Sequence, residues 1–524
     1  MPTLEWIGKS KVINHHLDVP YRVLEEQYTY NAEKSGNMII HGDNLEALKS
    51  LLPQFEGRVK CIYIDPPYNT GNEGWVYNDN VNDPKIRKWL GEVVGKEGED
   101  LSRHDKWLCM MYPRLKLLQK LLSEDGIIFI SIDEIEHRYL EILMDEIFGA
   151  NNRIDTFVWQ NNYGGGAKSN HVVHIHEYVL CFAKNINTVG KLELPPDENI
   201  LKYYKYKDER FETRGPYRLQ PLATTSMDTR PNLRYPLYYD GNEIWPEKQW
   251  FWSKERALEA QANSELVFSE KNGKWSVNYK QYLNSDDGTE RKGKPYSIIT
   301  GIYTQAGTKA IKAILGNGKA FDFPKPPELI MYFIQMITTD NDIILDSFAG
   351  SGTTAHAVLN MNKADGGHRR FILVEMMDYA ESITAERVRR VIGGYGEGKN
   401  AAEGTGGDFS YYELGETLLL PDGNLNEEVG VDKIRAYIWY TETGEAMQEA
   451  ETENPYYLGT SRDTAYYFYY ERDRRTTLNY DFLETVTPDA EGYLIYADVC
   501  TIPEEVLKKY NIVFKKIPRD IVRV

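Results

Sequence analysis

Short apolar runs that end at polar residues alternate along this chain with segments of helical periodicity. The runs have the length and composition of buried strands: Met38–Asp43, Cys61–Pro66, Gly126–Asp133, Glu177–Lys184, Ile343–Phe348 and Phe371–Glu375. Helical patterns lie between or after them: Leu45–Leu52, Trp107–Leu122, Glu134–Ile147, Pro327–Ile337, Thr354–Met361 and Tyr379–Ile392. This alternation predicts an α/β fold with a parallel, doubly wound sheet, whose parts fall in two blocks, 35–185 and 320–395.

The segment between the two blocks, residues 186–319, has a different character. Its periodicity is weak, and stretches such as Tyr203–Lys207, Arg230–Tyr235 and Gln249–Lys254 interleave basic and aromatic residues. We expect a domain that recognises a macromolecular substrate. The alternative is a β-rich insertion whose aromatic side chains form its own core.

Three further parts complete the expected organisation. Residues 1–34 form an N-terminal extension, and residues 396–408 form a Gly-rich linker. Residues 409–524 form a β-rich C-terminal domain that contains the aromatic runs Ala436–Tyr440 and Tyr466–Tyr470.

Composition sets outer limits on the class of protein. A chain of 524 residues with 41% hydrophobic content suits roughly three domains with ordinary cores. It has no apolar run near the ~20 residues that span a bilayer, and its first residues do not resemble a signal peptide. Its 4 cysteines are far apart and lack metal-ligand spacing, so we expect buried free thiols, no metal and a cytoplasmic location.

The net charge of −18 argues at first against a nucleic-acid partner. However, residues 401–455 carry 13 acidic and 2 basic side chains, a net charge of −11, and the other 469 residues carry only −7. Binding to DNA needs a local basic surface rather than a basic total, so a DNA partner remains open.

The tetrad Asp65-Pro66-Pro67-Tyr68 follows the second predicted strand. The two prolines remove backbone N–H donors, so the backbone there offers carbonyl acceptors, and an ionised Asp65 also only accepts. A cluster of acceptors suits an exocyclic amine, and Tyr68 offers a face for stacking a base that has left its helix. The structural alternative is a Pro-rich turn after a strand.

A glycine-rich loop follows the strand that ends at Asp346. Gly350 and Gly352 allow a tight turn and a close backbone approach before a helix that begins near Thr353. The next strand ends at Glu375, 29 residues after Asp346, where an acid can bind both hydroxyls of a ribose. The loop lacks the lysine of a phosphate-binding loop. A nicotinamide cofactor remains possible on the glycines alone, but the tetrad favours S-adenosylmethionine.

Both motifs and several flanking stretches resemble a known family of enzymes. The stretches are Gly42–Glu46, Trp107–Leu115, Asp125–Asp133, His176–Tyr178 and Phe321–Pro326. With the tetrad placed before the loop, the chain resembles a β-class DNA adenine-N6 methyltransferase, and more closely the modification (Mod) subunit of type III restriction–modification systems. The resemblance implies a circularly permuted Rossmann-like methyltransferase sheet, with a target-recognition domain at 186–319.

The resemblance also implies a role for each candidate site residue. Asp65 and the Pro66 carbonyl hold the adenine N6, within the catalytic tetrad that Pro67 and Tyr68 complete, and Tyr68 stacks on the flipped base. Residues expected to bind S-adenosylmethionine are Asp43, Asp65, Lys325, Pro326, Asp346, Phe348, Gly350, Ser351, Gly352, Thr353 and Glu375. Among these, Glu375 binds the ribose, Asp43 contacts the adenine, and Lys325 with Pro326 closes over the methionine end.

Some of these residues have simpler explanations that stay open at this point. Asp43 is also placed to cap a helix that begins near Leu45. Lys325 could be a surface lysine in a Pro-rich turn. Ser131 and Asp133 could be structural or could contact the base, and His176 suits a packed strand position.

The expected partners are double-stranded DNA, a second copy of the chain and a restriction helicase–nuclease subunit of a restriction or phage-defence system. The region 409–524 is the candidate for dimer or partner contacts. Only 64 residues precede the tetrad, which is short for a type III Mod subunit. The open alternatives are a stand-alone DNA adenine methyltransferase, a cytosine-N4 methyltransferase and a non-catalytic DNA-reading subunit.

Overall fold

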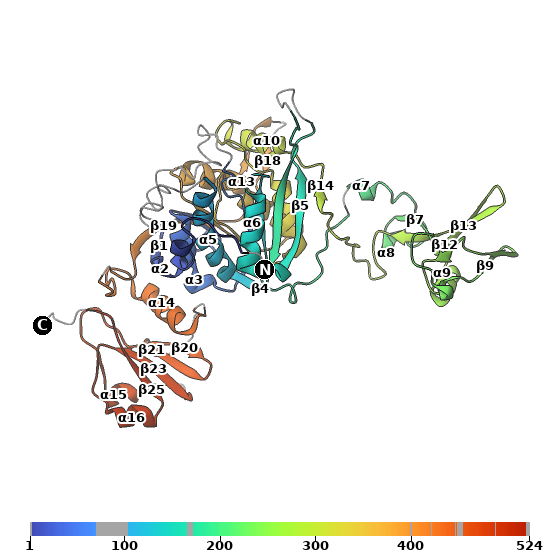
Figure 1. Ribbon diagram of the computed structural model, residues 1–524. Coiled ribbons are helices and arrows are strands. Elements are labelled where there is room, and N and C mark those ends of the chain that lie inside the picture. The colour runs from blue at the N-terminus through green and yellow to red at the C-terminus, as the bar shows by residue number, and fades with distance from the viewer. Residues whose placement is uncertain are drawn as a thin grey trace. The chain divides into compact units, whose positions relative to one another are not determined.

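The six predicted strands all lie in one ten-stranded sheet (Figure 1). Across the sheet the order is β1 (Arg22–Tyr30), β19 (Phe409–Thr417), β2 (Met38–His41), β16 (Arg370–Glu375), β15 (Ile343–Asp346), β3 (Val59–Ile64), β4 (Leu122–Ile132), β6 (His176–Ala183), β5 (Arg153–Gln160) and β14 (Ile298–Ile299). The six strands from β19 to β4 run parallel to one another. The α/β class with a large, mainly parallel sheet is therefore confirmed.

The computed structural model describes residues 3–69, 103–164, 171–196, 198–398, 401–420, 422–445, 447, 454–487 and 489–519. Parts of the first expected block (70–102 and 165–170) and two residues of the expected linker (399 and 400) lie outside the described residues. The chain divides into two units, of which the first comprises residues 1–191 and 296–524 and the second residues 192–295.

Helices cover both faces of the sheet because side chains alternate along each strand. On one face, Ile62 and Ile64 of β3 share a core with α3 (Asn44–Phe55), α5 (Arg103–Leu121) and α6 (His137–Met144). On the other face, Tyr63 packs against Phe333 of α11 (Pro327–Ile337), with ring centroids 6.2 Å apart. The helices α12 (Thr353–Asp365), α13 (Glu386–Gly393) and α10 (Thr304–Leu315) complete this second layer.

The sheet contains two further strands that were not predicted, β5 and β14, and it departs from the prediction in two more ways. First, β6 runs antiparallel to β4 and to β5, so the sheet is mixed rather than wholly parallel. The direction of a strand depends on how the chain returns to the sheet, which the hydrophobic pattern does not record. Consequently, the start of β6 lies at the edge where the parallel strands end.

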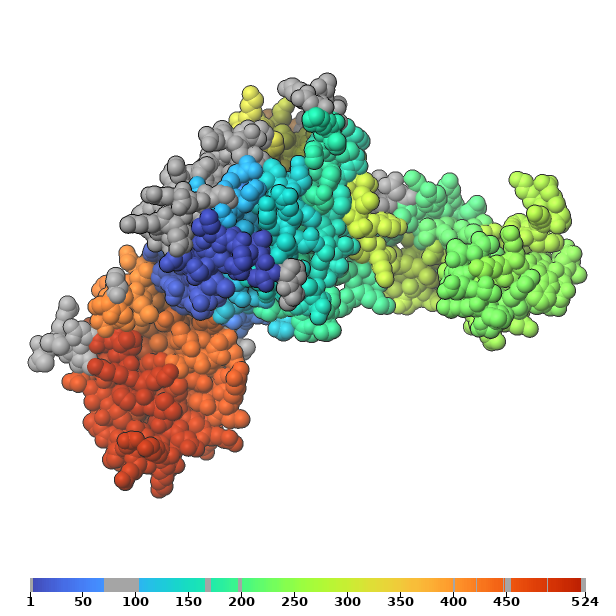
Figure 2. Space-filling model, in the orientation of Figure 1, coloured from blue at the N-terminus to red at the C-terminus, as the bar shows by residue number. Residues whose placement is uncertain are grey.

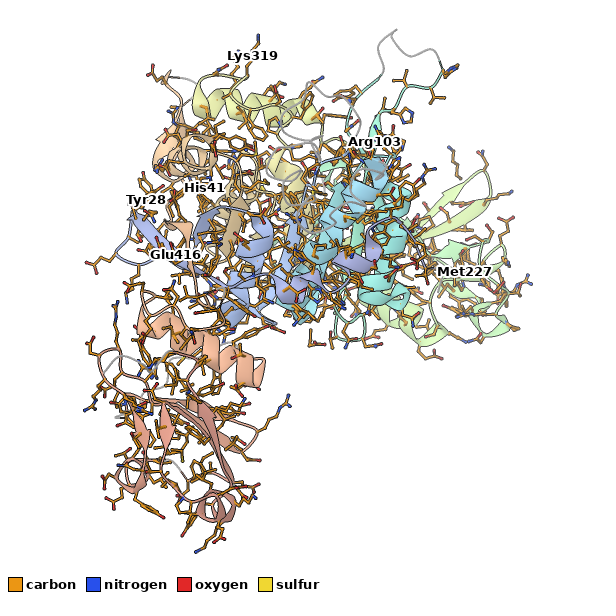
Figure 3. The ribbon with its side chains drawn as sticks, turned by 60° about the vertical axis from the view of Figure 1, so that its left-hand side comes forward. Tyr28, His41, Arg103, Met227, Lys319 and Glu416 are labelled. Carbon is orange, nitrogen blue, oxygen red and sulfur yellow. The ribbon has the colours of Figure 1, made fainter. Side chains whose placement is uncertain are left out.

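Second, β1 and β19 belong to the main sheet. We expected both in separate parts, 1–34 and 409–524, but β19 pairs with β2 in parallel and with β1 in an antiparallel ladder. Tyr28, Glu416 and His41 mark these three neighbouring strands in Figure 3. Their half-buried, Tyr- and Glu-rich sequences lack the apolar runs of the central strands, so the pattern did not assign them to the sheet.

The C-terminal part of the first unit begins after β19. A four-stranded sheet has the order β20 (Tyr457–Ser461), β21 (Thr464–Phe468), β23 (Gly492–Ala497) and β25 (Ile512–Lys516), and the helices nearby are α14 (Val431–Thr443), α15 (Tyr480–Leu483) and α16 (Glu504–Lys509). Helix α14 packs against α3, with Tyr440 hydrogen-bonded to Glu56. Figure 2 shows this part, in orange and red, against the N-terminal residues in blue.

The second unit has its own small core around two hairpins. A three-stranded sheet contains β12 (Leu266–Lys271), β13 (Lys274–Tyr282) and β7 (Tyr217–Pro221), and a second hairpin pairs β9 (Leu237–Tyr239) with β10 (Asn242–Ile244). Tyr235 and Trp250 are buried beside α9 (Lys254–Ala262), whereas Trp245 and Phe251 are about half exposed. The aromatic residues therefore divide between a core and a surface.

Candidate active site

The carboxyl ends of parallel strands meet at one edge of a sheet, where ligands usually bind. Asp65 follows β3, Asp346 ends β15 and Glu375 ends β16, and β15 lies between the other two strands. The fold thus brings together two motifs whose first residues are 281 positions apart. A cavity at this edge is lined by Tyr63, Asp65, Phe321, Phe323, Pro324, Lys325, Ile330, Asp346, Phe348, Ala349, Gly350, Ser351 and Thr353.

The tetrad turns from β3 into the core. The Pro67 carbonyl accepts a hydrogen bond of 2.6 Å from the indole N–H of Trp107, which is fully buried on α5. Tyr68 is only 8% exposed. The tetrad is therefore anchored in the interior at Pro67 and Tyr68, while Asp65 lines the cavity.

Lys325 occupies the centre of the acceptor cluster. Its ammonium group donates to both carboxylate oxygens of Asp65, at 2.9 and 2.8 Å, and to the Tyr68 hydroxyl at 2.8 Å. Pro326 follows as the N-cap of α11. The alternative that Lys325 is a surface lysine is wrong, because its side chain is only 7% exposed and lies 4.8 Å from the centre of the Tyr68 ring.

Glu177 is a second carboxylate in this cluster, and sequence reasoning assigned it no role. Its Oε2 accepts from the Tyr68 hydroxyl at 3.0 Å and lies 3.5 Å from the Lys325 ammonium group. Its Oε1 accepts from the side-chain amide of Asn161 at 2.9 Å. Glu177 reaches this edge because β6 runs antiparallel, and an acidic residue near the start of an apolar strand was the available signal.

Burial governs the electrostatics of the cluster. It raises the pKa of Asp65, against the opposing effect of the Lys325 charge. Burial also acts to lower the pKa of Lys325, but the two carboxylates Asp65 and Glu177 outweigh it and raise that pKa. The ammonium group therefore keeps its proton and neutralises part of a site that holds two acids.

The glycine loop is held by the acids at the ends of β15 and β16. Asp346 accepts from the backbone N–H of Phe348 at 3.0 Å and from the Thr354 hydroxyl at 2.5 Å, so its visible role is to shape the loop. Burial raises the pKa of Asp346 to about 7. Phe348 lines the cavity and also packs against the main core.

Glu375 joins the loop to the neighbouring strand. Its carboxylate accepts from the backbone N–H of Gly350 at 2.8 Å and from that of Met377 at 2.9 Å. Gly352 has a φ of +78°, and a Cβ there would lie 3.1 Å from the carbonyl oxygen of Thr384. The loop thus needs glycine at this position for both its conformation and its space.

A buried arginine lies behind the loop, and sequence reasoning missed it as well. Arg387 on α13 donates to the hydroxyls of Ser351 and Thr353, both at 2.7 Å. Its other terminal nitrogen lies 3.1 Å from Nδ1 of His356. A lone arginine in a charged amphipathic helix carries no local signal of burial.

Asp43 caps a helix, as its structural alternative proposed. Its Oδ1 accepts from the backbone N–H of Leu45 at 2.8 Å and of Glu46 at 3.4 Å, at the start of α3. Its Oδ2 lies 3.6 Å from the guanidinium group of Arg114. Asp43 follows β2, next to β16, and so stays near the strand that carries Glu375.

The remaining candidates have structural partners. Ser131 shares a hydrogen bond of 2.8 Å with the Tyr63 hydroxyl inside the sheet. Asp133 accepts from the backbone N–H of Ile135 at 3.0 Å, and burial raises its pKa to about 7. His176 contacts the Tyr178 hydroxyl at 3.1 Å along β6.

Within the described ranges, no three His, Cys, Asp or Glu side chains are grouped in a way that could hold a metal ion. The same ranges contain no helix with the length and apolar character needed to cross a membrane. Three of the free cysteines are buried, and the fourth, Cys500, is partly exposed.

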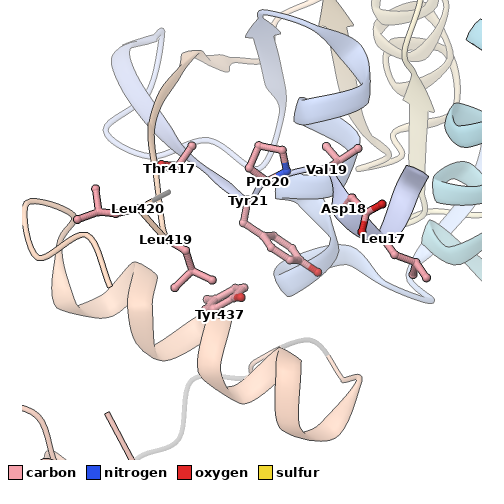
Figure 4. Close-up of a pocket in the computed structure, with 9 residues that line it drawn as sticks. All are labelled: Leu17, Asp18, Val19, Pro20, Tyr21, Thr417, Leu419, Leu420 and Tyr437. Carbon is pink, nitrogen blue, oxygen red and sulfur yellow. The ribbon is translucent and has the colours of Figure 1, made fainter. Parts of the chain in front are cut away.

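A larger cavity of about 460 Å³ lies elsewhere in the first unit (Figure 4). It is lined by Leu17, Asp18, Val19, Pro20, Tyr21, Thr417, Leu419, Leu420 and Tyr437. Asp18 is its only acidic residue, and neither predicted motif contributes to it. We therefore place the chemistry at the smaller cavity between the tetrad and the loop.

Comparison with known proteins identifies the family of this chain. Residues 59–386 match the family model described as DNA methylase (N6_N4_Mtase). The chain is 32% identical to the type III restriction-modification enzyme EcoPI Mod subunit of Escherichia phage P1, over 71% of this chain and 63% of that protein. It is 33% identical to the StyLTI Mod subunit of Salmonella typhimurium, over 68% of this chain and 54% of that protein.

A third relative is the type II methyltransferase M.KpnI of Klebsiella pneumoniae. Identity is 34%, and the match covers 66% of this chain and 81% of that protein. The chain spans less than two thirds of the length of the two Mod subunits. The family match includes the tetrad, the second unit, the loop and Glu375. This chain therefore belongs to the DNA methylase family.

Proposed function

We propose that this chain transfers a methyl group from S-adenosylmethionine to N6 of adenine in double-stranded DNA. The observation that carries the proposal is the acceptor cluster of Asp65, Tyr68 and Glu177 beside a glycine loop held by Glu375. The Lys325 ammonium group in that cluster marks a position that favours N–H donors, as an exocyclic amine would require.

The residues of the second motif fit S-adenosylmethionine. The Glu375 carboxylate can accept from ribose hydroxyls, and Gly352 adopts a positive φ that turns the loop beside the cavity. Phe348 offers an apolar wall, and Ser351 and Thr353 offer hydroxyl groups to the same cavity. When bound, the cofactor supplies an electrophilic methyl group on its sulfonium. Asp43 contributes through the turn that it caps.

The chain's own residues then prepare the base. Unstacking an adenine costs a few kcal/mol, and stacking on Tyr68 offsets about 1–3 kcal/mol of that cost. Asp65 accepts a hydrogen bond from the N6 amino group, which makes the nitrogen lone pair more available for attack. The Lys325 ammonium group has to release Asp65 as the amine arrives. Glu177 is the second carboxylate, and it can then balance the positive charge of Lys325.

The domain layout follows from this assignment. The tetrad strand β3 precedes the loop strand β15 in the chain but lies beside it in the sheet, which supports a circularly permuted methyltransferase domain. The insertion expected at 186–319 corresponds to the unit 192–295, which we assign to target recognition. That unit has 17 basic and 17 acidic residues, so the net charge of −18 lies outside it.

We assign the chain to the modification and recognition role of a restriction or phage-defence system, acting as a homodimer with a restriction helicase–nuclease subunit. Its similarity to Mod subunits supports this role. The stand-alone alternative has its own support, because the chain spans 81% of a type II methyltransferase. Co-purification with the product of a neighbouring restriction gene separates the two.

The central test uses the purified full chain with S-adenosylmethionine and unmethylated DNA, followed by nucleoside mass spectrometry. We expect N6-methyladenine and no N4-methylcytosine. Asp65→Asn keeps the shape of the side chain but replaces an acceptor by an amide, and it should slow transfer by about 100-fold while DNA binding persists. N4-methylcytosine as the product, or the absence of any methylated base, would overturn the proposal.

A further inference from the structure

Arg387 is an unusual charge inside the first unit. Its side chain is fully buried, and its hydrogen bonds go to uncharged groups: the hydroxyls of Ser351 and Thr353, the Ser351 carbonyl and His356. Its Nε has no hydrogen-bond partner. Among the described residues, Arg387 forms no ion pair with a carboxylate. Buried charges are normally paired, so this one needs an explanation.

The charge persists at neutral pH. Burial lowers the pKa of Arg387 to about 9, and the electrostatic effects of Tyr395 and the exposed Glu328 only partly oppose the shift. His356 stays neutral, because burial and the Arg387 charge lower its pKa well below the usual value. A single positive charge therefore lies directly behind the glycine loop.

The direction of the hydrogen bonds follows from the chemistry of the guanidinium group, which can only donate. The oxygens of Ser351 and Thr353 must accept from it, and these two oxygens also lie 3.3 Å from each other. Even if one hydroxyl donates to the other, at least one hydroxyl proton remains for donation elsewhere. Both residues line the cavity, and Thr353 begins the 13-residue helix α12. A hydroxyl donor, a helix N-terminus and a buried cation thus act on the same place.

We propose that Arg387 is a positioning residue that makes Ser351 and Thr353 a subsite for the carboxylate of the cofactor's amino-acid end. The inference rests on the proposed use of S-adenosylmethionine, whose only anionic group is that carboxylate. The acids Asp65 and Asp346 line other parts of the cavity and disfavour an anion there. Lys325 is already engaged by Asp65, which leaves Arg387 as the compensating charge.

The test compares two ligands that differ in this group. S-Adenosylhomocysteine carries the carboxylate, and 5′-methylthioadenosine lacks the whole amino-acid end. Their affinities are measured by calorimetry on the full chain, as wild type, Arg387→Met and Arg387→Lys. Arg389→Met is the matched control, because Arg389 lies on the same helix but pairs with Glu381 and Glu386.

Arg387→Met should weaken the affinity for S-adenosylhomocysteine by about tenfold or more and leave the affinity for 5′-methylthioadenosine within about twofold of the wild-type value. Arg387→Lys should recover part of the loss, and Arg389→Met should change neither affinity. An equal loss for both ligands, or no loss, would refute the carboxylate subsite. If Arg387→Met does not fold, Thr353→Val provides the test: it should lose affinity for S-adenosylhomocysteine but not for 5′-methylthioadenosine. Failure of the wild type to bind either ligand would instead remove the proposed cofactor.

Discussion

Replacing Glu177 by glutamine tests how the acceptor cluster admits a substrate. Glutamine keeps the size of the side chain, and its single oxygen can serve one of the Asn161 and Tyr68 contacts, but it removes one of the two negative charges around Lys325. Lys325 then depends on Asp65 alone. The incoming amine must replace Lys325 as the hydrogen-bond partner of Asp65. Without the second carboxylate, Lys325 would then lack a charge partner, so the entry of the base should cost more free energy.

The distances set the size of the effect. A unit charge 3.5 Å from the ammonium group interacts with it by about 5 kcal/mol at an effective dielectric constant of 20, which is an upper limit. Deletions of hydrogen bonds to charged groups typically realise about 1.5–3 kcal/mol. We therefore expect the rate of methyl transfer to fall by about 10–150-fold, while affinity for DNA changes by less than about threefold.

The assay is single-turnover transfer of a radiolabelled methyl group to an unmethylated DNA fragment that the wild type modifies, with DNA affinity measured on the same fragment. Glu141→Gln serves as the control, because Glu141 pairs with Arg153 away from the cavity. A wild-type rate in Glu177→Gln would show that Lys325 needs no second carboxylate. Parallel losses of rate, DNA affinity and thermal midpoint would indicate a purely structural role.

Three further predictions concern the tetrad and the loop. Tyr68→Ala should lower turnover by at least about tenfold but DNA affinity far less, since stacking acts on the flipped base; equal losses in both measurements would contradict the stacking role. Asp346 should make the protein less stable as pH rises. Its folded pKa of about 7 lies above the ordinary value of 3.8, so the folded state binds more protons than the unfolded state between these pH values. The free energy of unfolding therefore falls as pH rises through this range, by at most about 4 kcal/mol above pH 7. In Asp346→Asn the fall of the thermal midpoint between pH 5 and 8 should be smaller than in the wild type, and an unchanged slope would exclude Asp346 as its source. Gly352→Ala should lower the thermal midpoint by an amount equivalent to about 1–2 kcal/mol, because alanine is strained at a φ of +78°, whereas Gly366→Ala, with a similar φ but open space, should cost less.

Local sequence was sufficient where chemistry and conformation are set by neighbouring residues. The apolar runs before Asp65 and Asp346 predicted β3 and β15, and the glycines after Asp346 predicted the turn into α12. The cap at Asp43 was likewise foreseeable, because a cap needs only its own side chain and the next few N–H groups.

Contacts between distant segments depend on chain direction and packing, and the structure alone decided these. The antiparallel course of β6 puts Glu177 beside Tyr68, and the segment before α11 brings Lys325 onto Asp65. Arg387 lies behind the loop because α13 packs against α12.

The sequence by itself therefore determined the fold class, the two motifs and the family that they indicate, since each is written in short, local patterns. The tertiary structure decided which charges meet at the sheet edge: the second carboxylate, the lysine between the acids and the arginine behind the loop. Electrostatic interactions act through space over a few ångströms, and neighbours at that distance come from segments that no local pattern connects.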